Sequence, residues 1–412
     1  MSHATIWLCG VTVGLTTASI LCAAESLYVA PHGDDNHSGT MAAPFATLER
    51  ARDAVRKMMA RGLPTGGVTV YLRGGVYGRE ATFELRSQDS GTPQSPIVYR
   101  SYQNEEVRLV GGLTIPAAAF GPVAATSVAE RLDEKARGNV RAVDLKALGV
   151  TDFGKEPVRY RGAAPVPELF FDDKRMTLAR WPNEGWATID KIIQRGSVPR
   201  SGDKTKNPGI FQYKGDRPSR WRAADEVRLH GYWCFDWYDE VIKVKSIDTE
   251  NRQITFAAPH YYGIRYGNRS PRRYRAIGLL EEIDEPGECY IDRKSGVLYF
   301  WPPAPVANAR IVVSTLRDPV ISLTSVSHVT LRGLTIEACI GNGIAVKDGE
   351  QCQILACHVR NTGKTGIDLR GGVKHRVEAC DIHDTGTLGM TLAGGDRRKL
   401  IPAGHEAVNN HI

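Results

Sequence analysis

The sequence has few cysteines, few aromatic residues and no long apolar run after its first 24 residues. Six cysteines follow residue 24, and no two of them form a Cys-x-x-Cys pair, so the usual spacing of a structural zinc site is missing. No later stretch approaches the roughly 18 consecutive apolar residues that a membrane span requires. From these absences we predict no bound metal, no cofactor and no membrane span.

The first 24 residues have the features of a secretory signal. An apolar run extends from Ile6 to Leu21 and is followed by small residues at Ala23 and Ala24, which predicts a signal peptide at 1–24, cleaved before Glu25. We therefore expect a secreted or periplasmic protein. The net charge of +7 is modest, and an exported chain is not expected to meet nucleic acid.

Glycine and proline are plentiful, with 42 and 22 residues, whereas aromatic residues make up 8% of the chain. This composition is typical of a turn-rich β protein.

Within 44–59, apolar residues recur at helical spacing. We predict one helix there, capping the first coils of a domain at 25–114. Residues 115–310 have long aromatic and loop-rich stretches, which predict an inserted β module.

From residue 311 to 412 one pattern recurs every 23 residues. A fixed period of this length, with two short strands and a glycine corner in each copy, is typical of a β solenoid. Alternation within a strand directs Ile367 inward and Asp368 outward. We predict an all-β fold, a right-handed parallel β-helix of about 23 residues per coil. Residues that are 23 positions apart align in columns and are expected to stack on one another in neighbouring coils. These columns are Ile336, Val359 and Ile382; Gly343, Gly366 and Gly389; Ile344, Ile367 and Met390; and the turn residues Asn361 and Asp384.

The repeat also predicts the surroundings of the cysteines and histidines. Cys357 and Cys380 occupy an inward column, where a cysteine packs as a small apolar residue. We expect a buried ladder there and not a disulfide. His358 and His383 are expected to be surface histidines next to the turns and not metal ligands, because no third metal ligand recurs in register.

The final segment "AGHEAVNNHI" resumes the pattern after 30 residues and aligns Ile412 with Ile382. The last strand of a solenoid leaves backbone groups and an apolar core uncovered. We therefore expect a chain that ends within a coil, is truncated at its C-terminus, and would be a monomer if complete. Residues 25–412 alone are expected to aggregate.

The outward positions of the coils are where catalytic carboxyl groups would face a substrate. Glycoside hydrolysis needs two carboxyl groups across the bond, but Asp368 has Ala345 and Thr391 as its column neighbours. Asp368 is the best single candidate.

A polygalacturonase is disfavoured because "NTGKTGID" has Thr365 in place of an expected Asp. A polysaccharide lyase would use a basic residue, and Lys364 and Arg370 lie near Asp368 in the sequence.

An aromatic run at "HGYWCFDWYDE" is the candidate sugar-binding surface. Flat rings with a polar edge suit stacking on sugar faces, and we assign this role to Trp233, Trp237 and Tyr238. The alternative is a core strand, because Trp233, Phe235 and Trp237 are spaced by two and would share one face.

Three segments together resemble the secreted β-helix proteins of glycoside hydrolase family 141: "LYVAPHGDDNHSGTMAAPFATLERARDAVR", "ELFFDDKRMTLARWPNEGW" and "LLEEIDEPGECYIDRKSGVLYFWPP". The resemblance implies a glycoside hydrolase acting on plant or algal polysaccharide that contains fucose or xylose. The acids suspected of catalysis in that family lie in later coils than this chain has, so none is transferred, and residues 25–412 alone are expected to lack glycosidase activity. Two other functions remain open: a non-catalytic glycan-binding or surface structural protein, and a polysaccharide lyase.

Overall fold

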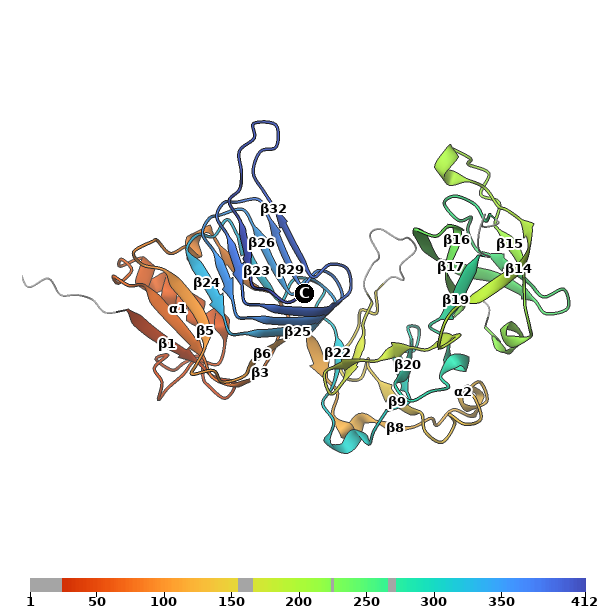
Figure 1. Cartoon of the computed structure of the whole chain (residues 1–412). Coiled ribbons are helices and arrows are strands. Elements are labelled where there is room, and N and C mark those ends of the chain that lie inside the picture. Colours follow the sequence, from red (N-terminus) through yellow and green to blue (C-terminus); the bar gives the residue numbers. More distant parts are fainter. Residues whose placement is uncertain (1–23, 155–165, 224–225, 266–271) are drawn as a thin grey trace, which may run out of the picture.

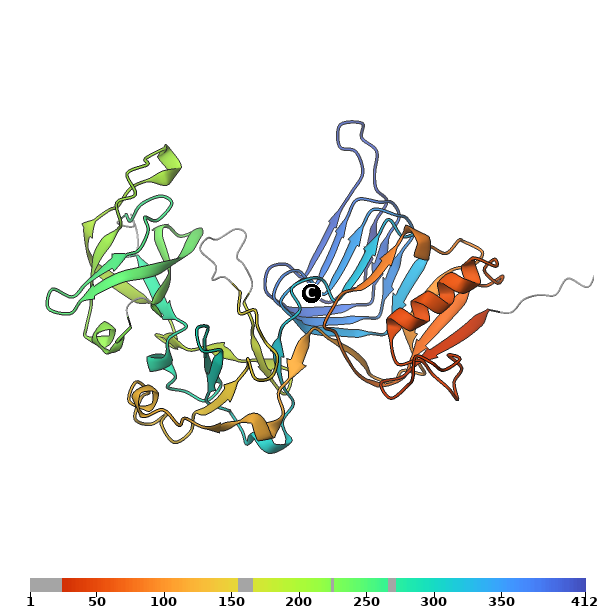
Figure 2. The ribbon, with the colours of Figure 1, turned by 180° about the vertical axis from the view of Figure 1, so that it is seen from behind.

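The computed structural model describes residues 24–154, 166–223, 226–265 and 272–412. The predicted signal peptide, except Ala24, lies outside these residues. Figures 1 and 2 show a stack of parallel coils on one side and a group of smaller sheets on the other. No helix among the described residues is long and apolar enough to cross a membrane.

Three parallel sheets form the walls of the coil stack. The first contains β1 (Glu25–Val29), β2 (Val68–Leu72), β5 (Ile97–Ser101), β24 (Val329–Arg332), β27 (Gln353–Leu355), β30 (Arg376–Glu378) and β33 (Glu406–Val408). The second contains β4 (Phe83–Arg86), β23 (Ile321–Thr324), β26 (Ile344–Lys347), β29 (Ile367–Arg370) and β32 (Met390–Ala393). The third contains β3 (Gly75–Gly78), β6 (Val107–Val110), β25 (Thr335–Cys339), β28 (His358–Thr362) and β31 (Asp381–Thr385). The chain is therefore a parallel β-helix.

The register of the sheets follows the sequence repeat. Ile344 pairs with Ile367, which pairs with Met390. The two isoleucines are fully buried, and Met390 packs against the same core while partly exposed. In the last coil the interval between paired residues is 30 and not 23, because Arg376 pairs with Glu406. The parallel bridge between Asp381 and His411 has the same interval, so the register is kept.

Helix α1 (Leu48–Met59) lies against β1 (Figure 2). Thr47 begins it, because the Thr47 hydroxyl accepts a hydrogen bond from the Arg50 N–H and so satisfies one free donor of the first turn. Its buried residues, Leu48, Ala51 and Val55, belong to the apolar core of the coils.

The chain leaves the stack after β6 and returns to it at β23, without a gap between the coils. β6 pairs directly with β25, and β5 with β24, although more than 200 residues separate them in sequence. The two connecting strands, β7 (Gly112–Thr114) and β22 (Ile311–Ser314), pair antiparallel. The residues between them are therefore inserted between two neighbouring coils.

The inserted residues form three further sheets with cores of their own. β7 and β22 share a sheet with β10 (Leu169–Phe171) and β11 (Lys174–Arg175). The next contains β8 (Gly121–Pro122), β9 (Arg141–Asp144), β12 (Thr177–Leu178), β20 (Glu288–Asp292) and β21 (Val297–Phe300), with helix α2 (Thr126–Ala129) nearby in sequence. The third contains β13 (Arg180–Trp181), β14 (Ala187–Gln194), β15 (Ile210–Tyr213), β16 (Arg228–Phe235), β17 (Tyr238–Asp248), β18 (Gln253–Phe256) and β19 (Arg273–Ile277).

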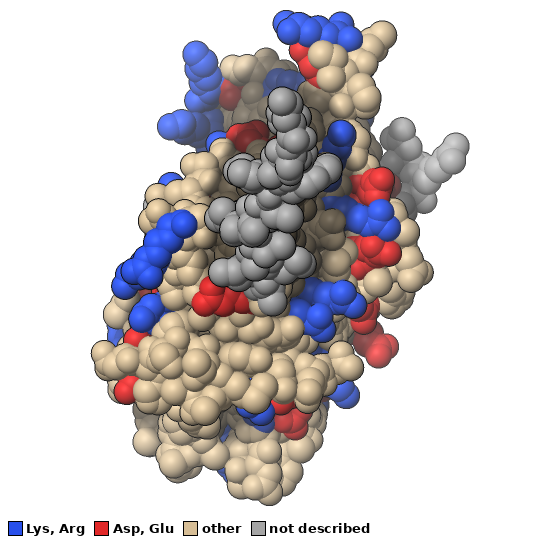
Figure 3. All heavy atoms as spheres, turned by 90° about the vertical axis from the view of Figure 1, so that its left-hand side faces the viewer, with Lys and Arg blue, Asp and Glu red and all other residues tan. Residues whose placement is uncertain are grey.

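The six described cysteines are all buried and unpaired. Cys357 and Cys380 belong to the apolar core of the coils, which confirms the predicted buried ladder. On the visible part of the face in Figure 3, basic and acidic side chains are interspersed. The net positive charge is therefore not concentrated there.

Candidate functional site

A buried ionic network joins the inserted sheets to the outer face of the coils. The carboxylate of Glu337, on β25, is 1% exposed. It accepts hydrogen bonds from Arg108 Nε (2.8 Å), Arg310 Nη2 (2.8 Å) and Arg360 Nε (2.9 Å). Asp173, in the turn between β10 and β11, binds the same three guanidinium groups. Two carboxylates therefore share three arginines across the junction.

Both carboxylates of the network are held in the charged state. Burial raises the pKa of Glu337, but the hydrogen bonds and charges of the three arginines outweigh it and place that pKa below its ordinary value. The same balance lowers the pKa of Asp173. Neither group is suited to donate a proton near neutral pH, so the network serves to attach the insert to the coils.

Beside this junction lies a cleft of about 640 Å³. Among the described residues, its lining comes from the insert except for Asp384, which lies within β31. The charged lining residues are the cations Arg175, Arg180, Arg228, Lys243, Arg293 and Lys294 and the acids Glu168, Glu226, Asp292 and Asp384. The lining therefore has more basic than acidic side chains. A smaller cavity of about 400 Å³ lies nearby, and Asp172 is the acidic residue among those that line it.

Glu168, immediately before β10, differs from the other acids of the cleft. Its Oε1 lies 3.0 Å from Arg175 Nε, whereas its Oε2 is buried and accepts no hydrogen bond from the described residues. About 29% of the side chain stays exposed. Desolvation raises the pKa of Glu168 above its ordinary value, although the charge of Arg175 opposes this. Glu168 is thus the cleft carboxyl best suited to carry a proton.

Arg175 connects Glu168 to the coils. Its Nη2 donates to the backbone carbonyl oxygens of Thr362 (3.3 Å) and Asp384 (2.8 Å). Asp384 has a positive φ of 52°, as expected of a turn residue, and its carboxylate is exposed and bound to His383 Nδ1. The cleft therefore brings together one desolvated and one solvated carboxyl group from segments distant in sequence.

The other two acids of the cleft have structural partners. Glu226 accepts hydrogen bonds from Arg131 (2.9 Å) and from the Tyr290 hydroxyl (3.1 Å). Asp292 accepts the Lys294 N–H (2.9 Å) in the turn between β20 and β21. These contacts explain both side chains without a catalytic role.

The predicted catalytic residue, Asp368, lies elsewhere. It pairs with Ala345 and Thr391, and neither is acidic. It points outward between buried Ile367 and Leu369, but only 18% of its side chain is exposed because Arg370 and Asn342 lie against it. The prediction of an exposed Asp368 is therefore wrong, and the cleft lining includes neither Asp368 nor the basic candidates Lys364 and Arg370.

The predicted sugar-binding residues are divided by the structure. Trp233 is fully buried in the core of the insert, and its Nε1 donates to the Glu240 carbonyl (2.9 Å). Its assignment as a sugar platform is therefore wrong. Trp237 is 60% exposed and its ring stacks on Phe235 at 5.3 Å. The chain turns between β16 and β17 at this point, so the alternation expected of one continuous strand ends. Tyr238 is half-buried beside Tyr261 and Tyr262.

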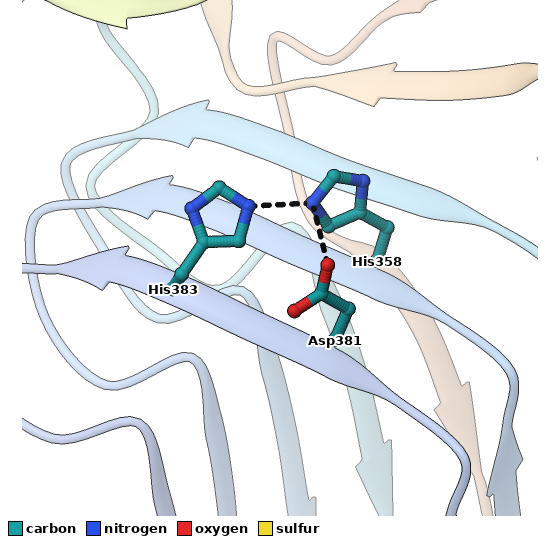
Figure 4. Close-up of side chains that lie close together, drawn as sticks. All are labelled: His358, Asp381 and His383. Carbon is teal, nitrogen blue, oxygen red and sulfur yellow. Dashed lines mark hydrogen bonds and ion pairs between the residues drawn. The ribbon is translucent and has the colours of Figure 1, made fainter. Parts of the chain in front are cut away.

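The two histidines predicted to lie at the surface are in contact with each other. His358 Nε2 lies 2.7 Å from His383 Nε2, and Asp381 Oδ2 lies 3.7 Å from His358 Nε2 (Figure 4). The expectation that no third ligand lies in register is therefore wrong. The sequence did hold the signal, because Asp381 follows His358 by one period and precedes His383 by two residues.

Comparisons with known proteins support the coil architecture. The sequence model of a family described as "right handed beta helix region" matches residues 319–401. The chain is 36% identical over 93 residues to pectate lyase PEL9 of Emericella nidulans, which covers 23% of this chain and 20% of that protein. It is also 36% identical over 87 residues to the uncharacterised protein YwoF of Bacillus subtilis, covering 21% of this chain and 16% of that protein. The matched part is thus about a fifth or less of each curated relative.

A solved structure titled "Glycoside hydrolase" is similar over most of the chain. The match has a TM-score of 0.69 and 18% sequence identity, and it covers 93% of this chain and 69% of that one. At this identity the likeness concerns the fold, which includes both the coils and the insert.

Proposed function

We propose that this protein is an exported enzyme that cleaves a polysaccharide at the cleft between the coils and the insert, as a glycoside hydrolase. The observation that carries the proposal is Glu168 in the wall of an open cleft: its pKa is raised, and one of its oxygens accepts no hydrogen bond from the described residues. The glycoside hydrolase with the same fold and the family 141 resemblance support the reaction class.

The two carboxyl groups of the cleft can take the two roles that hydrolysis requires. One group must be protonated to donate to the leaving oxygen, and the other must be ionised to act as nucleophile or base. Glu168 suits the first role because it is desolvated. Asp384 suits the second because it is solvated and bound to His383. Both lie among the described residues, whereas the sequence offered Asp368 as its candidate and the family 141 resemblance implied acids in later coils.

The excess of basic residues in the cleft suggests the substrate class. Among the described residues, six cations and four acids line the cleft, and a basic cleft attracts anionic ligands. We infer a plant or algal polysaccharide that carries uronic acid together with xylose or fucose. The predicted export of the chain would bring it to such a substrate.

A polysaccharide lyase is the second candidate, and the match to pectate lyase PEL9 favours it. A lyase abstracts a proton next to a uronate carboxyl group, and the same basic cleft would bind that uronate. The two reactions differ in their products, because elimination leaves an unsaturated sugar and hydrolysis does not.

One assay separates these functions. Purified protein is incubated with xylan, glucuronoxylan, a fucose-containing glycan and polygalacturonate, and both reducing ends and ultraviolet absorption of unsaturated products are followed. We expect new reducing ends without that absorption, with glucuronoxylan or the fucose-containing glycan preferred. Absorption rising together with the reducing ends would establish the lyase instead, and no cleavage of any substrate would contradict both.

The non-catalytic alternative is favoured by exposed Trp237, stacked on Phe235. If this pair is a sugar platform, Trp237→Ala should weaken glycan binding about tenfold, because a ring contact contributes up to about 1.5 kcal/mol. Trp237→Phe keeps a ring and should retain most of the affinity. Affinity electrophoresis in the preferred glycan measures both. Equal binding by the alanine variant would remove Trp237 from the binding surface.

A further inference from the structure

The cluster of His358, Asp381 and His383 is built by two neighbouring strands of the third coil sheet. His358 pairs with Asp381, and Arg360 pairs with His383. Because side chains alternate along a strand, Asp381 and His383 project from the same face of β31. Figure 4 shows both imidazole rings and the carboxylate converging on one point. Their ligand atoms all lie within 4.8 Å of one another.

The hydrogen bonds around the cluster orient its ligand atoms. His383 Nδ1 lies 2.7 Å from Asp384 Oδ2, which assigns the ring proton to Nδ1 and leaves a lone pair on Nε2. A carboxylate on the second nitrogen is the usual support of a metal-bound histidine. Asp381 Oδ1 is likewise 2.8 Å from His411 Nδ1, and Oδ2 remains on the side of His358.

We propose that His358, Asp381 and His383 bind a divalent transition-metal ion of the zinc class through two imidazole nitrogens and one carboxylate oxygen. A zinc ion lies about 2.0–2.1 Å from each such ligand, so tetrahedral ligand atoms are about 3.3 Å apart. The distances of 2.7 Å and 3.7 Å in the cluster lie on either side of that value. The site therefore forms by small side-chain rotations together with loss of the proton that His358 Nε2 donates to His383 Nε2, because a metal-bound nitrogen is deprotonated.

The charges and exposure of the surroundings allow a cation to enter. Arg360 is the nearest basic residue in the strand pair, but its guanidinium is already bound to Glu337 and Asp173. The three ligand side chains are each between 34% and 49% exposed, so water can complete the coordination. The nitrogen ligands select zinc, nickel or cobalt over calcium, which prefers oxygen.

Another histidine pair in the coils provides the contrast. His375 and His405 stack at 5.2 Å on adjacent coils. However, Nδ1 of each accepts a backbone N–H, and they are not part of a group of three ligands within reach of one ion among the described residues. His405→Ala is thus a matched control for the loss of one histidine of a stacked pair.

The test uses full-length, untagged, metal-stripped protein and metal alone, so it is independent of the proposed cleavage. We expect one Zn²⁺ per chain by calorimetry, and visible absorption bands when Co²⁺ replaces it. Asp384→Asn should weaken binding by roughly 10–100-fold, the usual effect of losing a carboxylate that orients a metal-bound histidine. His358→Ala, His383→Ala and Asp381→Asn should weaken it further, while His405→Ala should not. Circular dichroism checks that every variant is folded.

Two outcomes would overturn the proposal. One is the absence of stoichiometric binding by the folded wild-type chain. The other is binding that His358→Ala and His383→Ala leave unchanged, which would locate the ion elsewhere.

Discussion

Replacing Glu168 with Gln is expected to lower the rate of polysaccharide cleavage by roughly 10²–10⁴-fold, the usual contribution of a general acid. Glutamine has nearly the same shape but no proton to give to the leaving oxygen. The ion pair with Arg175 (3.0 Å) is lost too, but glycan binding should largely persist, because the cleft keeps its cations. Steady-state rates and binding of the preferred glycan are measured on the same preparations.

The pH profile provides a second readout for Glu168. Its pKa is raised above the ordinary value of 4.5, so the proton is retained at higher pH and activity should fall as pH rises through the raised pKa. A raised pKa in the folded state also favours folding at low pH, and this contribution is lost as pH rises through it. Glu168→Gln should abolish both effects.

Asp368→Asn is the matched variant, because Asp368 was the candidate from the sequence and lies outside the cleft lining. We expect it to keep most of the activity. If Asp368→Asn is inactive while Glu168→Gln is not, the catalytic site belongs to the coil face and the cleft assignment is wrong. If both variants are active, neither carboxyl group is the acid.

Replacing Glu337 with Gln is expected to destabilise the protein by about 3–5 kcal/mol, the cost of removing one partner from a buried ion pair. Arg108, Arg310 and Arg360 would then share only Asp173. Arg310 and Asp173 come from the insert whereas Glu337 is on β25, so the junction between insert and coils should weaken as well. Chemical unfolding followed by fluorescence gives the free energy, and limited proteolysis reports on the junction.

Unfolding at acidic pH should reveal the stabilisation that the Glu337 carboxylate contributes. The pKa of Glu337 is lowered from its ordinary value of 4.5, so its stabilisation is present above that value and is lost as pH falls through the lowered pKa. Glu337→Gln should lack this loss. Glu84→Gln is the control, since Glu84 is also outward on a coil strand but its pair with Arg86 is exposed, and such pairs contribute about 0–1 kcal/mol. Equal effects of the two variants would contradict the structural role of Glu337.

The coils could be predicted because their information is local and repeated. Each coil buries the same positions against the coils before and after it, so the 23-residue period indicates both the inward column of Ile344 and Ile367 and the burial of Cys357 and Cys380. The turn residues Asn361 and Asp384 also follow, because short polar side chains favour the left-handed backbone found at both. These features depend on sequence neighbours or on one fixed interval.

The candidate site could not be predicted in this way, because its groups come from segments without a common period. Glu168 is linked to Asp384 through Arg175, which binds the Asp384 carbonyl oxygen. Arg175 and Asp384 are more than 200 residues apart in the sequence. Trp233 and Trp237 differ in exposure because the chain turns between β16 and β17, and the spacing alone did not locate that turn. The sequence by itself determined the coil, its register and its core. Only the tertiary structure decided which carboxyl groups are desolvated, since desolvation depends on how the insert packs beside the coils.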